Sequence, residues 1–145
     1  MYFEQFTPGQ IITTAERRAT AEDLDRFLEL SGLTNPIFMS DQGARAAGHR
    51  RRLVPAPWQL SLAMGLCQGA GFFDHVVAVL GFDQVRFHGP VHPGDRLRLA
   101  AEVLLCRQTR NPRRGLVELS YRLFKLEGQD AMTARATYLM RRRGG

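Results

Sequence analysis

The sequence predicts an α+β fold in which an antiparallel sheet wraps around one central helix. One observation is a change in the spacing of apolar residues along the chain. This spacing predicts mostly helices in the first half and almost only strands in the second half. The other observation is the segment 53–73, which contains no charged side chain. A helix of this composition is apolar nearly all round, so a curved sheet that covers it is the arrangement that buries it.

The length and composition are those of one globular domain, which we expect to span residues 1–145. With 145 residues and 44% hydrophobic side chains, the chain is long enough to bury one core. No segment combines a basic start, a short apolar run and a small-residue cleavage site, so we expect a cytoplasmic location. Cys67 and Cys106 lack metal-ligand spacing and are interpreted as small buried side chains.

The net charge of +6 raises the local concentration of polyanions, which include nucleic acids and phosphorylated ligands. Two arginine clusters stand out, at residues 50–52 and 141–143. Neither has aromatic residues between the arginines or belongs to a recognisable nucleic-acid module, so nucleic-acid binding is not favoured. The second cluster is interpreted as a solvated chain end.

Capping residues mark two helices in the first third of the chain. Thr20 is a good N-cap for a helix that is predicted to end near Gly32. Ser40 or Asp41 then caps a second, shorter helix that is predicted to run through Ala47.

The uncharged segment 53–73 is long enough to suggest a membrane span, which needs about 20 apolar residues. Two prolines at its start, together with Gln59 and Gln68, argue against a span. We predict instead a buried helix from about Pro57 to Gly71, because proline is tolerated in the first turn of a helix.

The remaining residues favour four or five antiparallel strands, since apolar and polar side chains alternate along them. One or two strands are expected in residues 76–87, and one in each of the ranges 96–105, 117–123 and 132–140. Residues 10–18 are expected to be extended, and turns are expected at 111–115 and 127–130.

Two segments carry a resemblance to a known family. Residues 30–38 read Leu-Ser-Gly-Leu-Thr-Asn-Pro-Ile-Phe, and residues 85–95 read Val-Arg-Phe-His-Gly-Pro-Val-His-Pro-Gly-Asp. They resemble the patterns Ser-Gly-Asp-x-Asn-Pro-x-His and Arg-Phe-x-x-Pro-Val-x-Pro-Gly-Asp of the MaoC-like dehydratase and (R)-specific enoyl-CoA hydratase family. The resemblance covers roughly residues 5–142. The end of the second motif has a structural reason, because His-Pro-Gly-Asp is a turn that starts the strand after it.

The resemblance implies a hot-dog fold and a homodimer with a thioester tunnel along the dimer interface. In active relatives, an aspartate and a histidine after the first helix activate the water that adds to an enoyl thioester or leaves it. Here those positions hold Leu33 and Phe38, and neither side chain can move a proton. The family also uses backbone N–H groups at the start of the central helix to polarise the thioester carbonyl. Pro55 and Ala56 stand where the family has His-Gly.

Asn35 and His49 are the candidates to replace the missing catalytic pair. Asn35 is not a base at neutral pH, so a turn or capping role is its alternative interpretation. His49 precedes the central helix, and its alternative is a surface-loop histidine. The substrate-binding candidates are Ala56 and Trp58 at the start of the central helix and, at the phosphates of coenzyme A, Arg50, Arg51 and Arg52. No metal site and no cofactor besides the acyl thioester itself are expected.

Three functions fit these observations. The first is an acyl-CoA or acyl-ACP hydratase or dehydratase that acts through other groups or with a dyad-bearing hot-dog partner, in a heterodimer. The second is a homodimer that binds acyl-CoA or an acyl carrier protein without catalysis. The third is a hot-dog thioesterase, which needs a carboxylate near the thioester carbonyl. No acidic residue stands out for that role, and the isolated chain is expected not to hydrate crotonyl-CoA.

Overall fold

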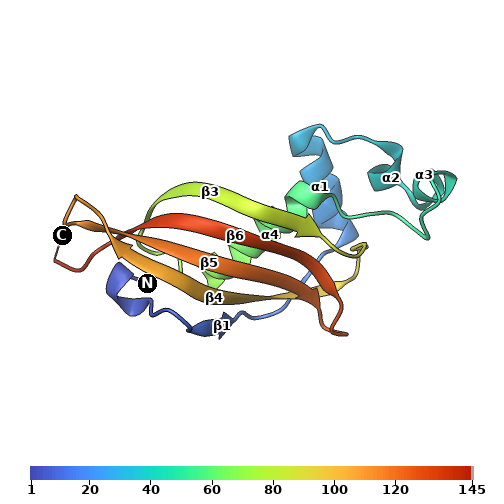
Figure 1. The fold of residues 1–145 in the computed structure, drawn as a ribbon. Coiled ribbons are helices and arrows are strands. Elements are labelled where there is room, and N and C mark those ends of the chain that lie inside the picture. Colours follow the sequence, from blue (N-terminus) through green and yellow to red (C-terminus); the bar gives the residue numbers. More distant parts are fainter. Residues whose placement is uncertain (145) are drawn as a thin grey trace.

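The computed structural model describes residues 1–144, in which one antiparallel sheet curls around a single long helix, α4 (Figure 1). The long strands are β3 (Val76–Phe87), β4 (Arg96–Gln108), β5 (Arg114–Lys125) and β6 (Asp130–Arg141). Their order in the sheet is β1-β4-β5-β6-β3, and every pairing is antiparallel. The predicted architecture, an antiparallel sheet around a central helix, is confirmed.

The sheet has six strands, whereas the sequence predicted four or five. The difference lies in the extended start of the chain, which forms β1 (Ile11–Thr13) and β2 (Arg17–Arg18). Both short strands pair with β4, one after the other. These segments form strands because they pair with the free edge of β4. Their own sequences do not show an alternation of apolar and polar residues.

Helix α4 spans Ala56–Gly69, so it begins one residue before the predicted start and ends two residues before the predicted end. Pro55 is the N-cap and Pro57 lies in the first turn, where the missing N–H breaks no helical hydrogen bond. Gly71 has a φ of +81°, which turns the chain out of the helix. The helix contacts β4 and β5, and none of the helices in residues 1–144 has the length and hydropathy that a membrane span requires.

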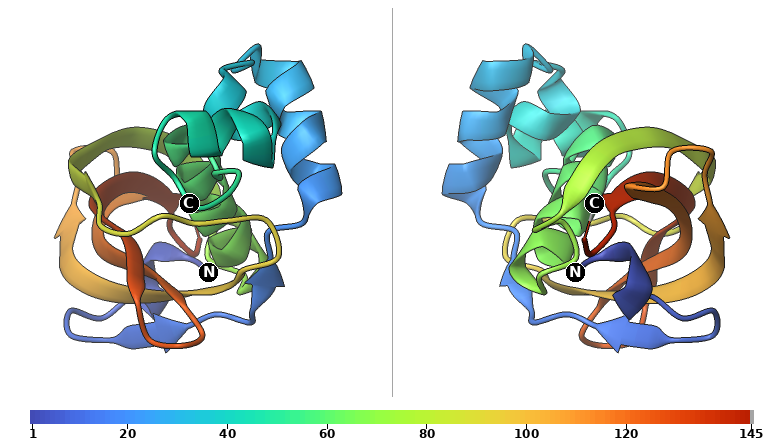
Figure 2. Two further views of the ribbon diagram at one scale, coloured as in Figure 1. Left: turned by 90° about the vertical axis from the view of Figure 1, so that its right-hand side faces the viewer. Right: turned by 90° about the vertical axis from the view of Figure 1, so that its left-hand side faces the viewer.

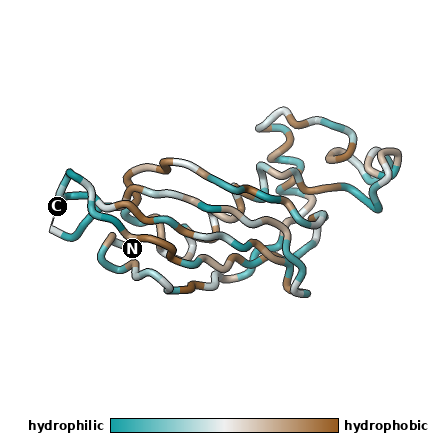
Figure 3. The backbone as a smooth tube through the Cα atoms, viewed as in Figure 1, coloured by the Kyte–Doolittle hydropathy of each residue, from teal (hydrophilic) through white to brown (hydrophobic). Residues whose placement is uncertain are grey.

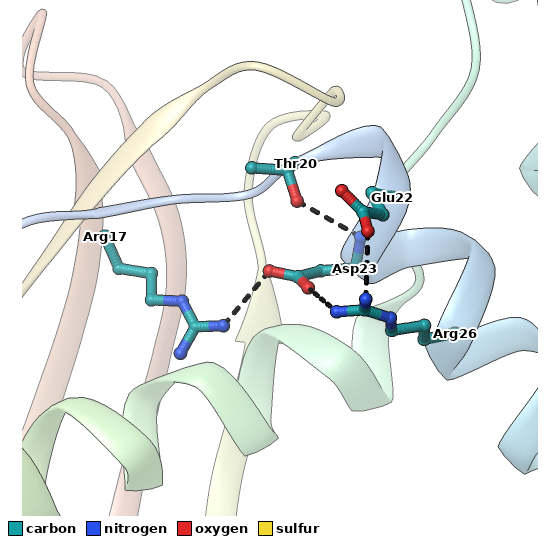
Figure 4. A network of polar contacts seen from close by, with 5 residues as sticks. All are labelled: Arg17, Thr20, Glu22, Asp23 and Arg26. Carbon is teal, nitrogen blue, oxygen red and sulfur yellow. Dashed lines mark hydrogen bonds and ion pairs between the residues drawn. The ribbon is translucent and has the colours of Figure 1, made fainter.

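Helix α1 (Ala21–Ser31) begins and ends at the predicted residues. The Thr20 hydroxyl accepts a hydrogen bond from the N–H of Asp23 at 3.1 Å, and Gly32 ends the helix with a φ of +75°. The carboxylate of Asp23 is paired with Arg17 and Arg26, each at 3.3 Å (Figure 4). Acidic side chains in this first turn also match the positive end of the helix dipole.

Two short helices, α2 (Pro36–Met39) and α3 (Asp41–Ala46), follow α1. The second was predicted, and its cap is Ser40, whose hydroxyl accepts from the N–H of Gly43 at 3.0 Å. The first was not predicted, because four residues are too few to show a helical period. The two helices pack so closely that a Cβ on Gly43 would lie 2.3 Å from the carbonyl oxygen of Pro36.

Helices α1, α2 and α3 gather at the end of the sheet where α4 begins (Figures 1 and 2). The opposite end, which holds the C-terminus, is mostly hydrophilic (Figure 3). The loop between β3 and β4 returns to the helical end and contains the predicted turn, in which Gly94 has a φ of +96°. The N–H of Asp95 donates to the carbonyl oxygen of His92 at 3.1 Å, and the N–H of His92 donates to the Asp95 carboxylate at 2.8 Å. This loop and the helices build the candidate site.

Candidate functional site

A cavity of about 500 Å³ lies at the first turn of α4, between the short helices and the loop after β3. Three stretches of the chain contribute to it: the start of α2, the segment that leads into α4, and the end of β3 with its loop. Its lining residues are Ile37, Phe38, His49, Leu53, Val54, Ala56, Gln59, Phe87, His88, Gly89, Pro90 and Val91. Ligand sites of small molecules are typically apolar cavities with a few polar groups, and this one has that composition.

Three polar side chains line this cavity. His49 comes from the loop before α4, and His88 comes from the loop after β3, where its Nε2 lies 2.7 Å from the Thr133 hydroxyl. Gln59 comes from α4 and is 4% exposed. The lining contains no carboxylate, so histidine is the only side chain there that can accept or donate a proton near neutral pH.

The start of α4 offers the cavity a backbone donor. Pro57 has no N–H, and the N–H groups of Trp58 and Gln59 both bond to the carbonyl oxygen of Pro55, at 3.1 and 3.2 Å. The N–H of Ala56, which lines the cavity, is therefore the first-turn donor that can meet a ligand. The positive end of the helix dipole lies at the same place.

The two positions that hold the acid and base in active relatives are apolar in three dimensions as well. Phe38 lies in the cavity wall, and Leu33 packs against the core from the loop between α1 and α2. Both side chains are partly buried hydrophobic groups. Phe38 makes this part of the cavity wall drier than a histidine would.

Asn35 and Trp58 do not line the cavity. The Asn35 side chain accepts a hydrogen bond from the N–H of Ile37 at 3.1 Å and so caps α2, which is the alternative interpretation of this residue. Trp58 is 7% exposed and stacks on Phe27, with 5.8 Å between the ring centroids. The catalytic role of Asn35 and the binding role of Trp58 remain predictions that this arrangement does not favour.

Of the three arginines predicted at the coenzyme A phosphates, two have other partners within the protein, namely Arg51 and Arg52. Arg52 pairs with Asp25 and donates to the carbonyl oxygen of Phe38, and Arg51 donates to the carbonyl oxygen of Pro93. Arg51 and Arg52 line a separate hollow of about 300 Å³, outside the cavity at the first turn of α4. Arg50 is exposed, and its contact with a phosphate stays a prediction.

Two residues of the cavity were missed at the level of sequence. His88 stands in the second motif but was not named as a site residue, and Gln59 was noticed only as a polar interruption of the central helix. The signal for Gln59 was its position, because it shares the buried face of α4 with Leu62, Ala63 and Leu66. A single polar residue on an otherwise apolar helical face is a candidate for ligand contact.

A second hollow of about 430 Å³ shares His88 and Gly89 with the cavity. It contains Asp130, but this carboxylate is paired with Arg122 at 2.6 Å. Residues 1–144 also hold no group of three histidine, cysteine or acidic side chains arranged to bind a metal. The chemistry available to the cavity is therefore that of two imidazoles, a carboxamide and a backbone N–H.

A curved antiparallel sheet wrapped around one long helix defines the hot-dog fold. A family model described as MaoC like domain matches residues 3–122, and the chain belongs to this family. The resemblance that the two sequence motifs predicted is thereby confirmed.

Two curated relatives support this assignment. Protein MaoC of Klebsiella aerogenes is 34% identical over 98 residues, which are 68% of this chain and 29% of that protein. Mesaconyl-CoA hydratase of Cereibacter sphaeroides is 27% identical over 146 residues, which cover 98% of this chain and 41% of that protein. The chain thus spans less than half the length of either relative.

Solved structures agree with the fold. The (R)-hydratase of A. caviae involved in PHA biosynthesis superposes with a TM-score of 0.76 at 25% identity, over 93% of this chain and 97% of that one. A monoamine oxidase regulatory protein from Archaeoglobus gives a TM-score of 0.87 at 24% identity, over 98% and 95%. The HadBC (3R-hydroxyacyl-ACP dehydratase) complex of Mycobacterium tuberculosis gives 0.76 at 21% identity, over 91% and 96%.

Proposed function

We propose that this chain binds the acyl part of an acyl-CoA or acyl-ACP in the cavity at the start of α4, as a member of the hydratase and dehydratase family. The observation that carries the proposal is the lining of the cavity, in which mostly apolar side chains lie beside Ala56, the first residue of α4. An acyl chain fits the wall, and the N–H together with the helix dipole suits the thioester carbonyl.

In this proposal the chain shapes an acyl site and does not itself supply the usual acid and base. Leu33 and Phe38 occupy those positions, and no carboxylate lines the cavity. A hot-dog subunit that carries an intact dyad would then complete the active site in a heterodimer. The similarity to the HadBC complex, a dehydratase by its description, supports such a pairing.

His49 and His88 favour a second candidate function, which is hydration by the chain itself. Both line the cavity, and an imidazole can act as a general base or a general acid near neutral pH. Addition of water to an enoyl thioester needs one group to take a proton from the water and another to deliver one to the adjacent carbon. Two histidines could divide these roles. For a thioesterase no such observation exists, since the cavity lining holds no carboxylate.

Crotonyl-CoA hydration tests the two candidates. The purified chain should bind crotonyl-CoA but hydrate it no faster than buffer does, because Leu33 and Phe38 cannot activate water. Binding is measured by calorimetry and hydration by the loss of absorbance of the enoyl thioester. Clear turnover by the isolated chain would contradict the first candidate, and its loss in both His49→Gln and His88→Gln would establish the second. Absence of binding to any acyl-CoA or acyl-ACP would overturn the proposal as a whole.

A further inference from the structure

Arg52 connects four parts of the helical end of the molecule. Its side chain is only 13% exposed, and its Nε donates to the carbonyl oxygen of Phe38 in α2 at 2.5 Å. Its guanidinium group is also paired with Asp25 of α1. The backbone N–H of Arg52 donates to the Asp41 carboxylate of α3 at 2.9 Å, and its carbonyl oxygen lies 2.9 Å from the Nδ1 of His92 in the loop after β3. One residue thus joins α1, α2, α3 and that loop.

Helix α2 depends on these contacts for its position. It packs mainly on α3 and slightly on α1, and it has no comparable contact with the sheet or with α4. Besides the bond from the Arg52 side chain, the carbonyl oxygen of Ile37 accepts from the N–H of Leu53 at 3.1 Å. Ile37, Phe38 and Leu53 all line the cavity at the start of α4. The contacts of Arg52 therefore join two segments of the cavity wall.

The same contacts disfavour the role predicted for Arg52 at the phosphates of coenzyme A. Two of the nitrogens of its guanidinium group, Nε and Nη2, already donate to acceptors within the protein. Its charge is paired with Asp25, and its side chain is largely buried. A guanidinium group bound to two acceptors of the fold holds those acceptors at a fixed separation, because its donors are set in one rigid plane.

We propose that Arg52 is a positioning residue that fixes the part of the cavity wall formed by Phe38 and Leu53, an inference that rests on the proposed function. A wall that is held in place before binding needs no ordering when the ligand enters, and the saved cost increases the affinity. Without the guanidinium group, α2 keeps its packing on α3 but loses one of its two hydrogen bonds to the segment before α4. Arg52 thus acts on the ligand only through this wall.

Acyl ligands with and without phosphates test the proposal. Calorimetry measures the affinity of the wild type and of Arg52→Met for butyryl-CoA and octanoyl-CoA, and for the acyl-pantetheines of the same two chains, which carry no phosphate. Arg52→Met should bind every one of these ligands about tenfold more weakly, as expected for one lost charge-assisted hydrogen bond. A loss confined to the two CoA thioesters would place Arg52 at the phosphates instead, and this result would overturn the inference.

Arg142→Met is the matched control, because it removes a paired, half-buried arginine far from the cavity. Arg142 follows the end of β6, its side chain is 27% exposed, and it pairs with Glu4 at 2.9 Å. Thermal unfolding gives the melting temperatures of both variants, and binding is compared well below the lower of the two. Arg142→Met should keep the wild-type affinity for all four ligands. Equal weakening in the two variants would mean that Arg52 contributes only to general stability, and the inference would be wrong.

Arg52→Lys provides the same comparison if Arg52→Met does not fold. Lysine keeps a positive charge for Asp25 but lacks the planar group that also reaches the carbonyl oxygen of Phe38. Wild-type affinity in the variant overturns the role of Arg52 and leaves acyl-thioester binding intact. Failure of the wild type to bind any of the four ligands or an acyl-ACP overturns the proposed function, and the role of Arg52 with it.

Discussion

Cys67, Tyr121 and Tyr138 form a chain of polar side chains between α4 and the sheet. The thiol of Cys67 lies 3.4 Å from the Tyr121 hydroxyl, and the hydroxyls of Tyr121 and Tyr138 are hydrogen-bonded to each other. These contacts fix the rotation of α4 against β5 and β6. All three residues are buried, and loss of hydration disfavours their charged forms. Burial thus raises the pKa of Cys67 to about 12 and raises the pKa values of both tyrosines.

We expect the free energy of unfolding to fall as the pH rises above 9. In the unfolded chain the Cys67 thiol ionises near its ordinary value of 9.0, whereas in the folded chain it keeps its proton up to a pKa of about 12. Between these values the unfolded chain binds fewer protons, so stability decreases by up to about 1.4 kcal/mol per pH unit. Urea unfolding at intervals from pH 7.5 to pH 10 measures this slope.

Cys67→Ala is the control for the pH dependence. Tyrosine ionises in an unfolded chain only near pH 10, so between pH 9 and pH 10 the variant should lose less stability than the wild type. Equal slopes in the two proteins would show that the thiol is not responsible.

At the scale of elements, the turn before β4 depends on the side chain of Asp95. Its Oδ2 accepts hydrogen bonds from the N–H of His92 at 2.8 Å and from the Lys125 ammonium group at 3.0 Å. Arg51 lies 3.7 Å from the other carboxylate oxygen. Lys125 is the last residue of β5 and its side chain is 11% exposed, so the pair links the start of β4 to the end of β5 in a largely buried place.

Asp95→Asn should lower the free energy of unfolding by about 2–3 kcal/mol, because it leaves the ammonium group of Lys125 without its counter-charge. Urea unfolding at pH 7 measures the loss. Asp130→Asn is the matched control, since Asp130 pairs with Arg122 at a more exposed place, and less than about 1 kcal/mol should be lost there. Adding Lys125→Met to Asp95→Asn should restore part of the stability. Equal losses in the two single variants would contradict the argument.

The elements that could be predicted from the sequence are those with a local cause. Helix α1 was placed correctly because Thr20 caps it and Gly32 ends it. Helix α4 was predicted because its segment has no charged side chain, which is typical of a helix buried beneath a sheet. Helix α2 has four residues, too few to show a period. Strands β1 and β2 are short and exist through their pairing with β4, whose partner residues lie 78 to 91 positions further along the chain.

The candidate site was predictable only in part, for a similar reason. Phe38 and Ala56 could be named because they stand at motif positions, and both line the cavity. His88 lines the cavity because the loop after β3 lies next to the start of α4. No local sequence pattern indicates this contact. To predict Gln59 as a site residue, one must know which face of α4 meets the sheet and that the Gln59 Oε1 has no hydrogen-bond partner there.

At the scale of the whole molecule, β3 is the feature that a single chain leaves incomplete. It pairs with β6 on one side and with no other strand of residues 1–144 on the opposite side. The outer residues Val77, Val79 and Leu80 are apolar and 39%, 43% and 53% exposed. An exposed apolar edge strand favours pairing with another strand, and the homodimer or heterodimer expected from the resemblance would supply one.

We therefore expect the chain to form a dimer through β3, and Leu80→Lys should make it a monomer. The charge would have to be buried against the partner's strand, and lysine on an edge strand is a common protection against such pairing. We expect sedimentation velocity to show a dimer for the wild type at about 20 µM, and at least a tenfold weaker association for the variant, since a central apolar contact is typically worth more than about 1.4 kcal/mol. Leu30→Lys is the control, because Leu30 is 88% exposed on α1, away from β3, and its substitution should leave the dimer intact. A wild-type chain that stays monomeric at this concentration, while a dyad-bearing hot-dog subunit restores a dimer that Leu80→Lys prevents, would show instead that the edge is reserved for a different partner.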